Sequence, residues 1–160
     1  MPGVDPARFR ELLGHFATGV TVVTTRTPDG TPVGMTASAV AAVSLDPPLV
    51  LVCIDRRHDM HPALQAASHF VLNVLAANQE ALSRRFAELD VDRFADVAYR
   101  GSAAGVPVLD GVLAAIECEK RDAVAAGDHT VFFGLVTGGH TASGSPLVYY
   151  RSAYGAAGGT

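Results

Sequence analysis

A histidine stands at the start of a strand-like segment in the last third of the sequence. Residues 127–129 are Gly-Asp-His, and residues 130–136 are mostly β-branched or aromatic. Gly127 and Asp128 are typical of a tight turn, so the pattern places His129 at the first position of a strand. A side chain at that position can face a ligand instead of the core. A histidine that only caps the turn would explain the same residues.

A run of small residues, MTASA at 35–39, is a second place where a ligand could bind. On an extended chain, Thr36 and Ser38 lie on the same face. Small side chains allow a planar ligand to approach the backbone, whose N–H groups can then bond ring heteroatoms. A tightly packed sheet interior is the competing interpretation.

Arginines and histidines suggest two further kinds of site. SRRF at 83–86 places Arg84 on a predicted helix, where a guanidinium can bind a phosphate through two hydrogen bonds. A solvated helix face explains that arginine equally well. His58 and His61 are three residues apart and could share a metal on a helix. A surface turn explains them too, and we assign no metal site.

Composition and motifs exclude several classes of protein. The net charge is −4 with no long basic cluster, which argues against a nucleic-acid-binding protein. No apolar run is long enough to span a membrane, and the N-terminus lacks the pattern of a signal peptide. Dinucleotide-binding, P-loop and nucleophile-elbow motifs are absent. Cys53 and Cys118 are expected to be buried free thiols of a cytoplasmic protein.

Strands greatly outnumber helices among the elements that must position these residues. The length of 160 residues suits a single domain, with its core at about residues 8–154. Helices are predicted at 5–16, 57–67 and 78–89, with Asp5 capping the first and Asn78 the third. The first helix carries one apolar stripe, formed by Phe9, Leu12, Leu13 and Phe16. Strands are predicted at 20–26, 33–44, 49–55, 69–75, 112–126, 129–140 and 146–151. The continuous apolar run at 49–55 predicts a strand buried on both faces, residues 90–110 a loop, and the tail after 154 a loose end. Short turns favour a mainly antiparallel sheet closed into a barrel, with flanking helices.

Taken in order, several segments resemble the short-chain flavin reductase family, whose fold is the FMN-binding split barrel. They are FATGVTVVTT (16–25), GMTASAVAAVSLDPPLVLVCID (34–55), FVLNVL (70–75), LSRRFA (82–87), GDHTVFFGLV (127–136) and PLVYYRSAY (146–154). Each segment is modest alone, but the ordered set is specific and covers nearly the whole chain.

The resemblance implies a role for each matching residue. Met35, Thr36, Ala37, Ser38 and Ala39 would line the isoalloxazine ring and ribityl chain, and Val52, Cys53, Ile54 and Asp55 would place a second line of backbone groups beside the ring. Ser83, Arg84 and Phe86 would lie at the flavin phosphate, while Tyr150, Arg151 and Tyr154 would complete the nicotinamide side. His129 would be the catalytic-site residue that positions the reduced nicotinamide. Relatives often have a Ser or Thr shortly after the strand that contains Val52 and Cys53, where it helps to hold the flavin phosphate. In this sequence, Arg57 or His58 would substitute for it.

The family further implies an enzyme, an NAD(P)H-dependent flavin reductase that passes hydride to FMN or FAD and supplies reduced flavin to a separate monooxygenase. NADH is favoured because no basic motif for a 2′-phosphate is visible. A homodimer is expected, since such folds form the flavin cleft at a two-fold interface. The alternatives are an oxidase with tightly bound flavin, related to the pyridoxamine-phosphate oxidases, and a non-enzymatic flavin-binding or redox-sensing module.

Overall fold

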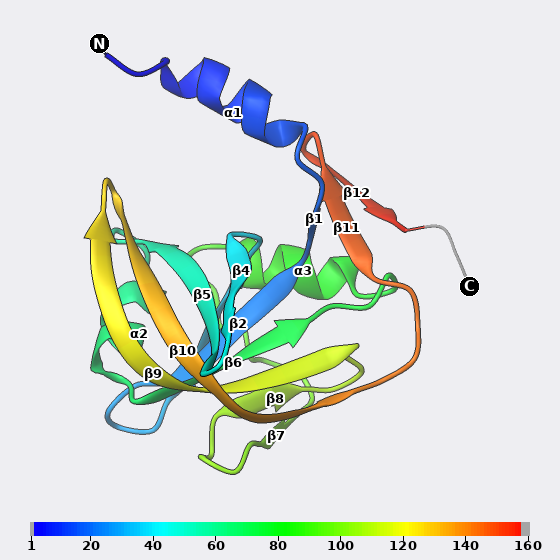
Figure 1. Cartoon of the computed structure of the whole chain (residues 1–160). Coiled ribbons are helices and arrows are strands. Elements are labelled where there is room, and N and C mark those ends of the chain that lie inside the picture. The colour runs from blue at the N-terminus through cyan, green and yellow to red at the C-terminus, as the bar shows by residue number, and fades with distance from the viewer. Residues whose placement is uncertain (1, 158–160) are drawn as a thin grey trace.

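A computed structural model describes residues 2–157 of the chain (Figure 1). The helices are α1 (Pro6–Gly14), α2 (Met60–Ala66) and α3 (Glu80–Ala87). The strands are β1 (Thr18–Gly19), β2 (Thr21–Arg26), β3 (Pro32–Ala37), β4 (Val40–Leu45), β5 (Pro48–Asp55), β6 (His69–Val74), β7 (Tyr99–Gly101), β8 (Pro107–Leu109), β9 (Ala114–Ala126), β10 (His129–Thr141), β11 (Leu147–Tyr150) and β12 (Ala153–Ala156). None of the described helices is long and apolar enough to cross a membrane.

A curled seven-stranded sheet forms the body of the molecule. Its strand order is β3-β2-β6-β9-β10-β5-β4, and each neighbouring pair is antiparallel. β3 and β4 are the two edges of this sheet and do not hydrogen-bond to each other. The mainly antiparallel β architecture is therefore confirmed, but the prediction that the barrel closes is wrong. The predicted strand 33–44 divides at Ser38 and Ala39, where the chain turns from one edge of the sheet to the other.

Both faces of the sheet are packed along β2 and β6. On one face, Val23, Leu72 and Phe132 join a core that α2 covers with Met60 and Leu64. On the opposite face, Val22, Val71 and Phe86 belong to a second core beneath α3 and β8. Alternation along β2 and β6 sends successive side chains into the two cores, which fixes the register of the sheet.

Four local predictions differ from the structure. β5 is buried on one face only, because its burial alternates along the strand. Residues 90–110 contain the β7–β8 hairpin, whose apolar residues Val106, Val108 and Leu109 pack into the core and so cannot form a loose loop. α3 begins after Gln79, which is its N-cap, and Asn78 does not cap it. At the chain end, β12 pairs with β11 through residues 153–156, so this part of the tail is held in place; residues 158–160 lie outside the described residues.

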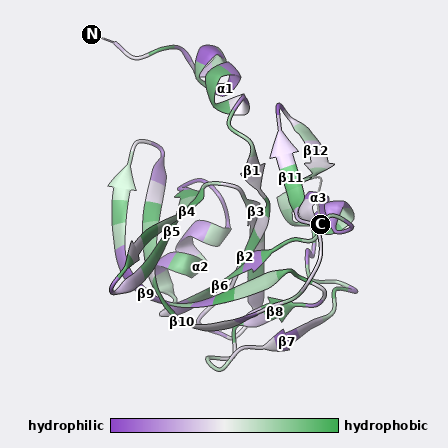
Figure 2. Cartoon of the chain, turned by 45° about the vertical axis from the view of Figure 1, so that its right-hand side comes forward, coloured by the Kyte–Doolittle hydropathy of each residue, from purple (hydrophilic) through white to green (hydrophobic). Residues whose placement is uncertain are grey.

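The first helix stands away from the sheet (Figure 2). Its predicted N-cap is confirmed, because the Asp5 carboxylate accepts hydrogen bonds from the backbone N–H groups of Ala7 and Arg8 at 2.8 and 2.9 Å. None of its residues is buried. The apolar stripe of α1 therefore does not enter the core, and it faces a groove described below.

Candidate active site

A groove of about 750 Å³ runs between α1 and the outer face of β4 and β5. Phe9, Leu13 and Phe16 of α1 and its following turn form one wall, while Ser38, Ala39, Val40, Ala41, Leu51 and Cys53 form the other; Ala17, Thr18, Gly19 and Thr21 complete the lining. Its size is within the range of small-molecule sites. Both sequence segments that were expected to border a flat ring contribute to the wall opposite α1, through Ser38, Ala39 and Cys53.

The two segments are joined directly by the backbone. The N–H of Cys53 donates to the carbonyl of Ala39 at 3.0 Å, which places the small residues of the first segment against the outer face of β5. Side chains on that outer face are small or of moderate size, so a planar group can lie close to the main chain there. Of the residues predicted at 35–39 and 52–55, Ser38, Ala39 and Cys53 line the groove, and their role in binding a ring stays a prediction.

His129 lies further along the same face of the sheet. It pairs across strands with Asp55, and Val131 pairs with Cys53, so Asp55 and Cys53 share a face with the histidine. The imidazole is 40% exposed, and its Nδ1 lies 2.7 Å from Oδ1 of Asp128. A carboxylate only accepts hydrogen bonds, so Nδ1 carries the proton and Nε2 is left for a ligand. This hydrogen bond from the His129 ring lowers the pKa of Asp128 below its ordinary value.

Arg57 is already engaged by a carboxylate. Its guanidinium donates to both carboxylate oxygens of Asp55, at 3.2 and 2.7 Å, and its backbone N–H donates to Oδ1 at 2.9 Å. These bonds from Arg57 strongly lower the pKa of Asp55. Arg57 would therefore have to share its charge with Asp55 in order to hold a phosphate.

Residues from β3, α3 and β12 form a second polar cluster. The Thr36 hydroxyl donates to the carbonyl of Ser83 at 2.6 Å, and the Ser83 hydroxyl lies 2.8 Å from the Tyr154 hydroxyl. Arg84 stacks over the Tyr154 ring at 4.8 Å and pairs with Glu80 at 2.7 Å. The hydrogen bond from Arg84 to Glu80 raises the pKa of Arg84. Four predicted site residues thus meet here, although they are scattered along the sequence.

Other predicted residues do not reach the groove through their side chains. Ala37, Val52, Ile54 and Phe86 are buried in the two cores, and Met35 packs against one of them. Tyr150 is 43% exposed, with its ring edge-on to His15. Arg151 lines a smaller hollow that adjoins the groove. The buried members can only act through their backbone groups.

Several residues of the site were missed from the sequence. Arg10, Leu51 and Ser152 line the groove or its adjoining hollow, and Asp128 holds the His129 ring. The Gly-Asp-His motif could have indicated Asp128, because a carboxylate beside a histidine is a common partner. Nothing in the sequence indicates Arg10, which stands in an ordinary amphipathic helix.

The histidines considered as metal ligands have protein partners instead. His61 Nε2 lies 2.8 Å from the Thr130 hydroxyl, and His58 Nδ1 lies 2.7 Å from Asp59 Oδ1. Burial lowers the pKa of His58. In the part of the chain that the structure describes, no group of three His, Cys, Asp or Glu side chains could hold a metal ion.

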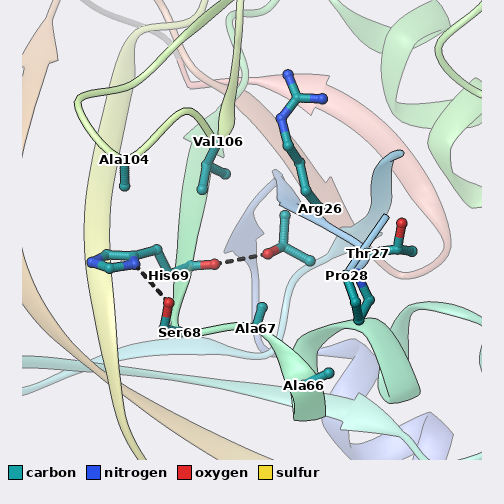
Figure 3. A pocket seen from close by; sticks show the side chains of 10 residues that line it. Arg26, Thr27, Pro28, Ala66, Ala67, Ser68, His69, Ala104 and Val106 are labelled. Atoms are coloured by element: carbon teal, nitrogen blue, oxygen red, sulfur yellow. Dashed lines mark hydrogen bonds between the residues drawn. The ribbon is translucent and has the colours of Figure 1, made fainter. Parts of the chain in front are cut away.

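Figure 3 shows a different cavity, between the β2–β3 turn and the residues around His69. There Thr25 donates to the His69 carbonyl at 2.7 Å, and Ser68 contacts the His69 ring at 3.0 Å. Its volume is about 250 Å³, below the usual range for drug-sized ligands. None of the predicted site residues lines it, so the long groove is the better candidate.

Comparison with known proteins identifies the class to which this fold and groove belong. A model of the flavin reductase like domain matches residues 13–158, and the chain belongs to that family. The chain is 45% identical over 156 residues to the FMN reductase (NADH) SmoA of Agrobacterium fabrum, a match covering 97% of this chain and 88% of the relative. The resemblance drawn from the ordered sequence segments is therefore confirmed.

Two further relatives extend the comparison. The chain is 41% identical over 152 residues to the reductase component of a 4-nitrophenol 4-monooxygenase/4-nitrocatechol 2-monooxygenase of Rhodococcus opacus, covering 95% of this chain and 81% of the relative. The solved NADH:FAD oxidoreductase SgcE6 of Streptomyces globisporus, in complex with NAD and FAD fragments, superimposes with a TM-score of 0.89 at 36% identity. That match covers 96% of this chain and 95% of the solved chain. The relatives give no support to a tightly flavin-bound oxidase or a non-enzymatic module.

Proposed function

We propose that this protein is an NADH-dependent flavin reductase, which reduces FMN or FAD for use by a separate monooxygenase. Relatives that match almost the whole chain carry these names. The structural observation behind the proposal is the groove in which Ser38, Ala39 and Cys53 face α1, on the same side of the sheet as His129.

The groove fits a flat tricyclic ring. Its floor carries small side chains from β4 and β5, and the α1 wall supplies aromatic and aliphatic surface. Such a combination supports one face of an aromatic ring while leaving backbone groups close to its edge and the other face free for a nicotinamide. We assign Ser38, Ala39 and Cys53 to direct contact with the ring. The remaining members of 35–39 and 52–55 hold the two backbone segments in place.

When bound, the flavin supplies the hydride-accepting atom of the reaction. The protein's task is then to align the two rings and exclude water, which needs no acid–base pair. His129 is proposed to orient the nicotinamide or its amide through Nε2, with Asp128 fixing the imidazole. Tyr150, Arg151 and Tyr154 are proposed on the nicotinamide side, and Ser83, Arg84 and Phe86 with Arg57 near the flavin phosphate.

A second copy of the chain is proposed to complete the groove. Large apolar side chains are exposed on α1 and the turn after it, on β4 and on the extended β9–β10 hairpin: Phe9 is 56% exposed, Phe16 71%, Val43 44%, Leu45 91% and Val124 47%. Exposed apolar groups gathered around one site mark an interface, and a two-fold dimer is the commonest assembly. Sedimentation equilibrium should give twice the chain mass; a monomer at micromolar concentration would contradict the dimer.

We also propose a cytoplasmic location.

The activity is tested by following NADH absorbance with purified protein, with and without FMN, FAD or riboflavin. We expect NADH loss to depend on added flavin. In His129→Ala, we expect kcat/KM for NADH to fall by about tenfold or more, since one positioning hydrogen bond is removed. His140→Ala is the matched control, because His140 contacts Arg100 away from the groove. If His129→Ala turns over NADH as the parent does, the nicotinamide has been placed wrongly.

A further inference from the structure

Two arginines at one end of the groove differ from the other basic residues of the protein. The sequence contains 12 Lys and Arg residues. Side-chain hydrogen bonds to protein groups are made by Arg8, Arg26, Arg56, Arg57, Arg84, Arg85, Arg93, Arg100, Lys120 and Arg121. Within residues 2–157, the structure shows no such bond or ion pair for the remaining two, Arg10 and Arg151.

Both arginines line the same hollow, which has a volume of about 310 Å³. The hollow adjoins the long groove, because Phe9, Leu13, Phe16, Thr18 and Ser38 line both. Its other lining residues are Gly14, Tyr149 and Ser152. No Asp or Glu is among the lining residues, so nothing in the hollow itself neutralises the two guanidiniums. We call this end of the groove the guanidinium corner.

The backbone at Arg151 is held in an unfavourable conformation. Arg151 and Ser152 have φ angles of 48° and 63°, and they form the two-residue turn between β11 and β12. Asn-Gly adopts such a turn far more readily than Arg-Ser does. The turn is also fixed to α1, since the Arg151 N–H donates to the Gly14 carbonyl at 3.0 Å. Strain of this kind concentrates at ligand sites, and here it sets a guanidinium in the hollow.

We infer that the guanidinium corner binds a phosphate group of a nucleotide whose ring lies in the groove. This inference rests on the proposed function. Two unpaired guanidiniums provide charge-assisted hydrogen bonds to phosphate oxygens, and the Ser152 hydroxyl can add another. Arg57 and Arg84, which we place near the flavin phosphate, each share their charge with a carboxylate already, because two nitrogens of each guanidinium donate to Asp55 or Glu80. The phosphate belongs either to the flavin or to NADH, and matched ligands with and without phosphate distinguish these sources.

The test measures equilibrium binding to the full chain, independently of turnover. Arg10→Gln and Arg151→Gln are compared with the parent for riboflavin and FMN by flavin fluorescence, and for nicotinamide riboside and NAD⁺ by calorimetry. We expect the dissociation constant of FMN or of NAD⁺ to rise about tenfold in each variant, with little change for the partner ligand that lacks phosphate. Added salt should weaken binding of the phosphate ligand more in the parent than in the variants.

Two controls separate this result from general damage. Arg8→Gln removes the same charge from the same helix, but Arg8 pairs with Glu11 at 2.8 Å and does not line the hollow. The double variant Arg151→Asn with Ser152→Gly relaxes the turn, so it should melt no lower than the parent while still losing phosphate affinity. If one of the single variants is unstable, these two controls still show whether phosphate affinity depends on the guanidinium corner.

The pattern of affinity losses shows which phosphate, if any, the guanidinium corner binds. A selective loss for FMN assigns the corner to the flavin phosphate, and a selective loss for NAD⁺ assigns it to the dinucleotide. The inference is overturned if both arginine variants bind FMN and NAD⁺ as the parent does, or if ligands with and without phosphate weaken equally. A parent that binds neither flavin nor NAD⁺ would contradict the proposed function itself, which is a different failure.

Discussion

The two cysteines show how one sheet gives the same residue type two environments. Cys53 lies on the outer face of β5 and lines the groove, whereas Cys118 is 1% exposed and packs in the core beneath α2. Burial raises the pKa of both thiols, and that of Cys118 to about 12. The sequence predicted two buried thiols, but the burial of a residue on a sheet depends on which face it occupies. That prediction holds for Cys118 and fails for Cys53, which is only partly buried.

Cys118 should make the stability of the protein depend on alkaline pH. A thiol in an unfolded chain ionises near pH 8.5, whereas folded Cys118 keeps its proton to about pH 12. The contribution of the buried thiol to the free energy of unfolding is therefore complete below about pH 8.5. It is lost as the pH rises toward about 12, the pKa of Cys118 in the folded protein. We expect the free energy of unfolding of Cys118→Ala, measured with urea from pH 8 to 11, to decline less steeply than that of the parent. Cys53→Ala should follow the parent more closely, and parallel curves for all three proteins would refute the assignment.

At the scale of elements, the long β10 strand depends on a glycine where it crosses the core. A Cβ added at Gly134 would lie 2.6 Å from Phe70 Cζ and 2.8 Å from Cys118 Cβ. No real Cβ tolerates such contacts, so the neighbouring strands would have to move. Gly134 thus permits the close packing of Phe70 against β10.

Gly134→Ala should destabilise the protein by about 1–3 kcal/mol, the usual cost of overpacking a core. Gly138→Ala is the control on the same strand, because its nearest contact would be Glu117 Oε2 at 3.8 Å. We expect that variant to unfold at the same urea concentration as the parent. Equal stability of the two alanine variants would show that Phe70 does not pack tightly against β10.

Two elements were misjudged from the sequence for one physical reason. The apolar run of β5 predicted burial on both faces, and the apolar stripe of α1 was typical of a helix facing a core. In the structure, Leu51 and Cys53 of β5 and Phe9 and Leu13 of α1 line the groove. A ligand site that binds an aromatic ring needs apolar walls, so its residues have the composition of a core. Sequence pattern alone cannot distinguish the two.

Other features were predictable because they depend on local chemistry. The Asp5 cap, the turn at Gly127 and the position of His129 at the start of β10 follow from residue preferences at caps and turns. The contacts between Thr36, Ser83 and Tyr154 are long-range and arise only from the topology of the sheet. The sequence therefore located the segments of the candidate site, while the guanidinium corner required the fold.

At the scale of the whole molecule, a curled sheet and an outlying helix enclose a groove between them. The sheet supplies small side chains and backbone groups, and α1 supplies an apolar wall. We propose that a flavin lying against β4 and β5 keeps its other ring face open to NADH, so hydride should pass directly between the two rings. This direct transfer is the central claim about the protein.

Anaerobic stopped-flow mixing of NADH with the protein and FMN tests that claim directly. We predict that the flavin absorbance bleaches in step with NADH oxidation, one flavin for each NADH. The rate should slow by a factor of about two or more when NADH carries deuterium at the transferred position of its nicotinamide. NADH consumed without bleaching of the flavin, or no NADH consumed at all, would contradict the account.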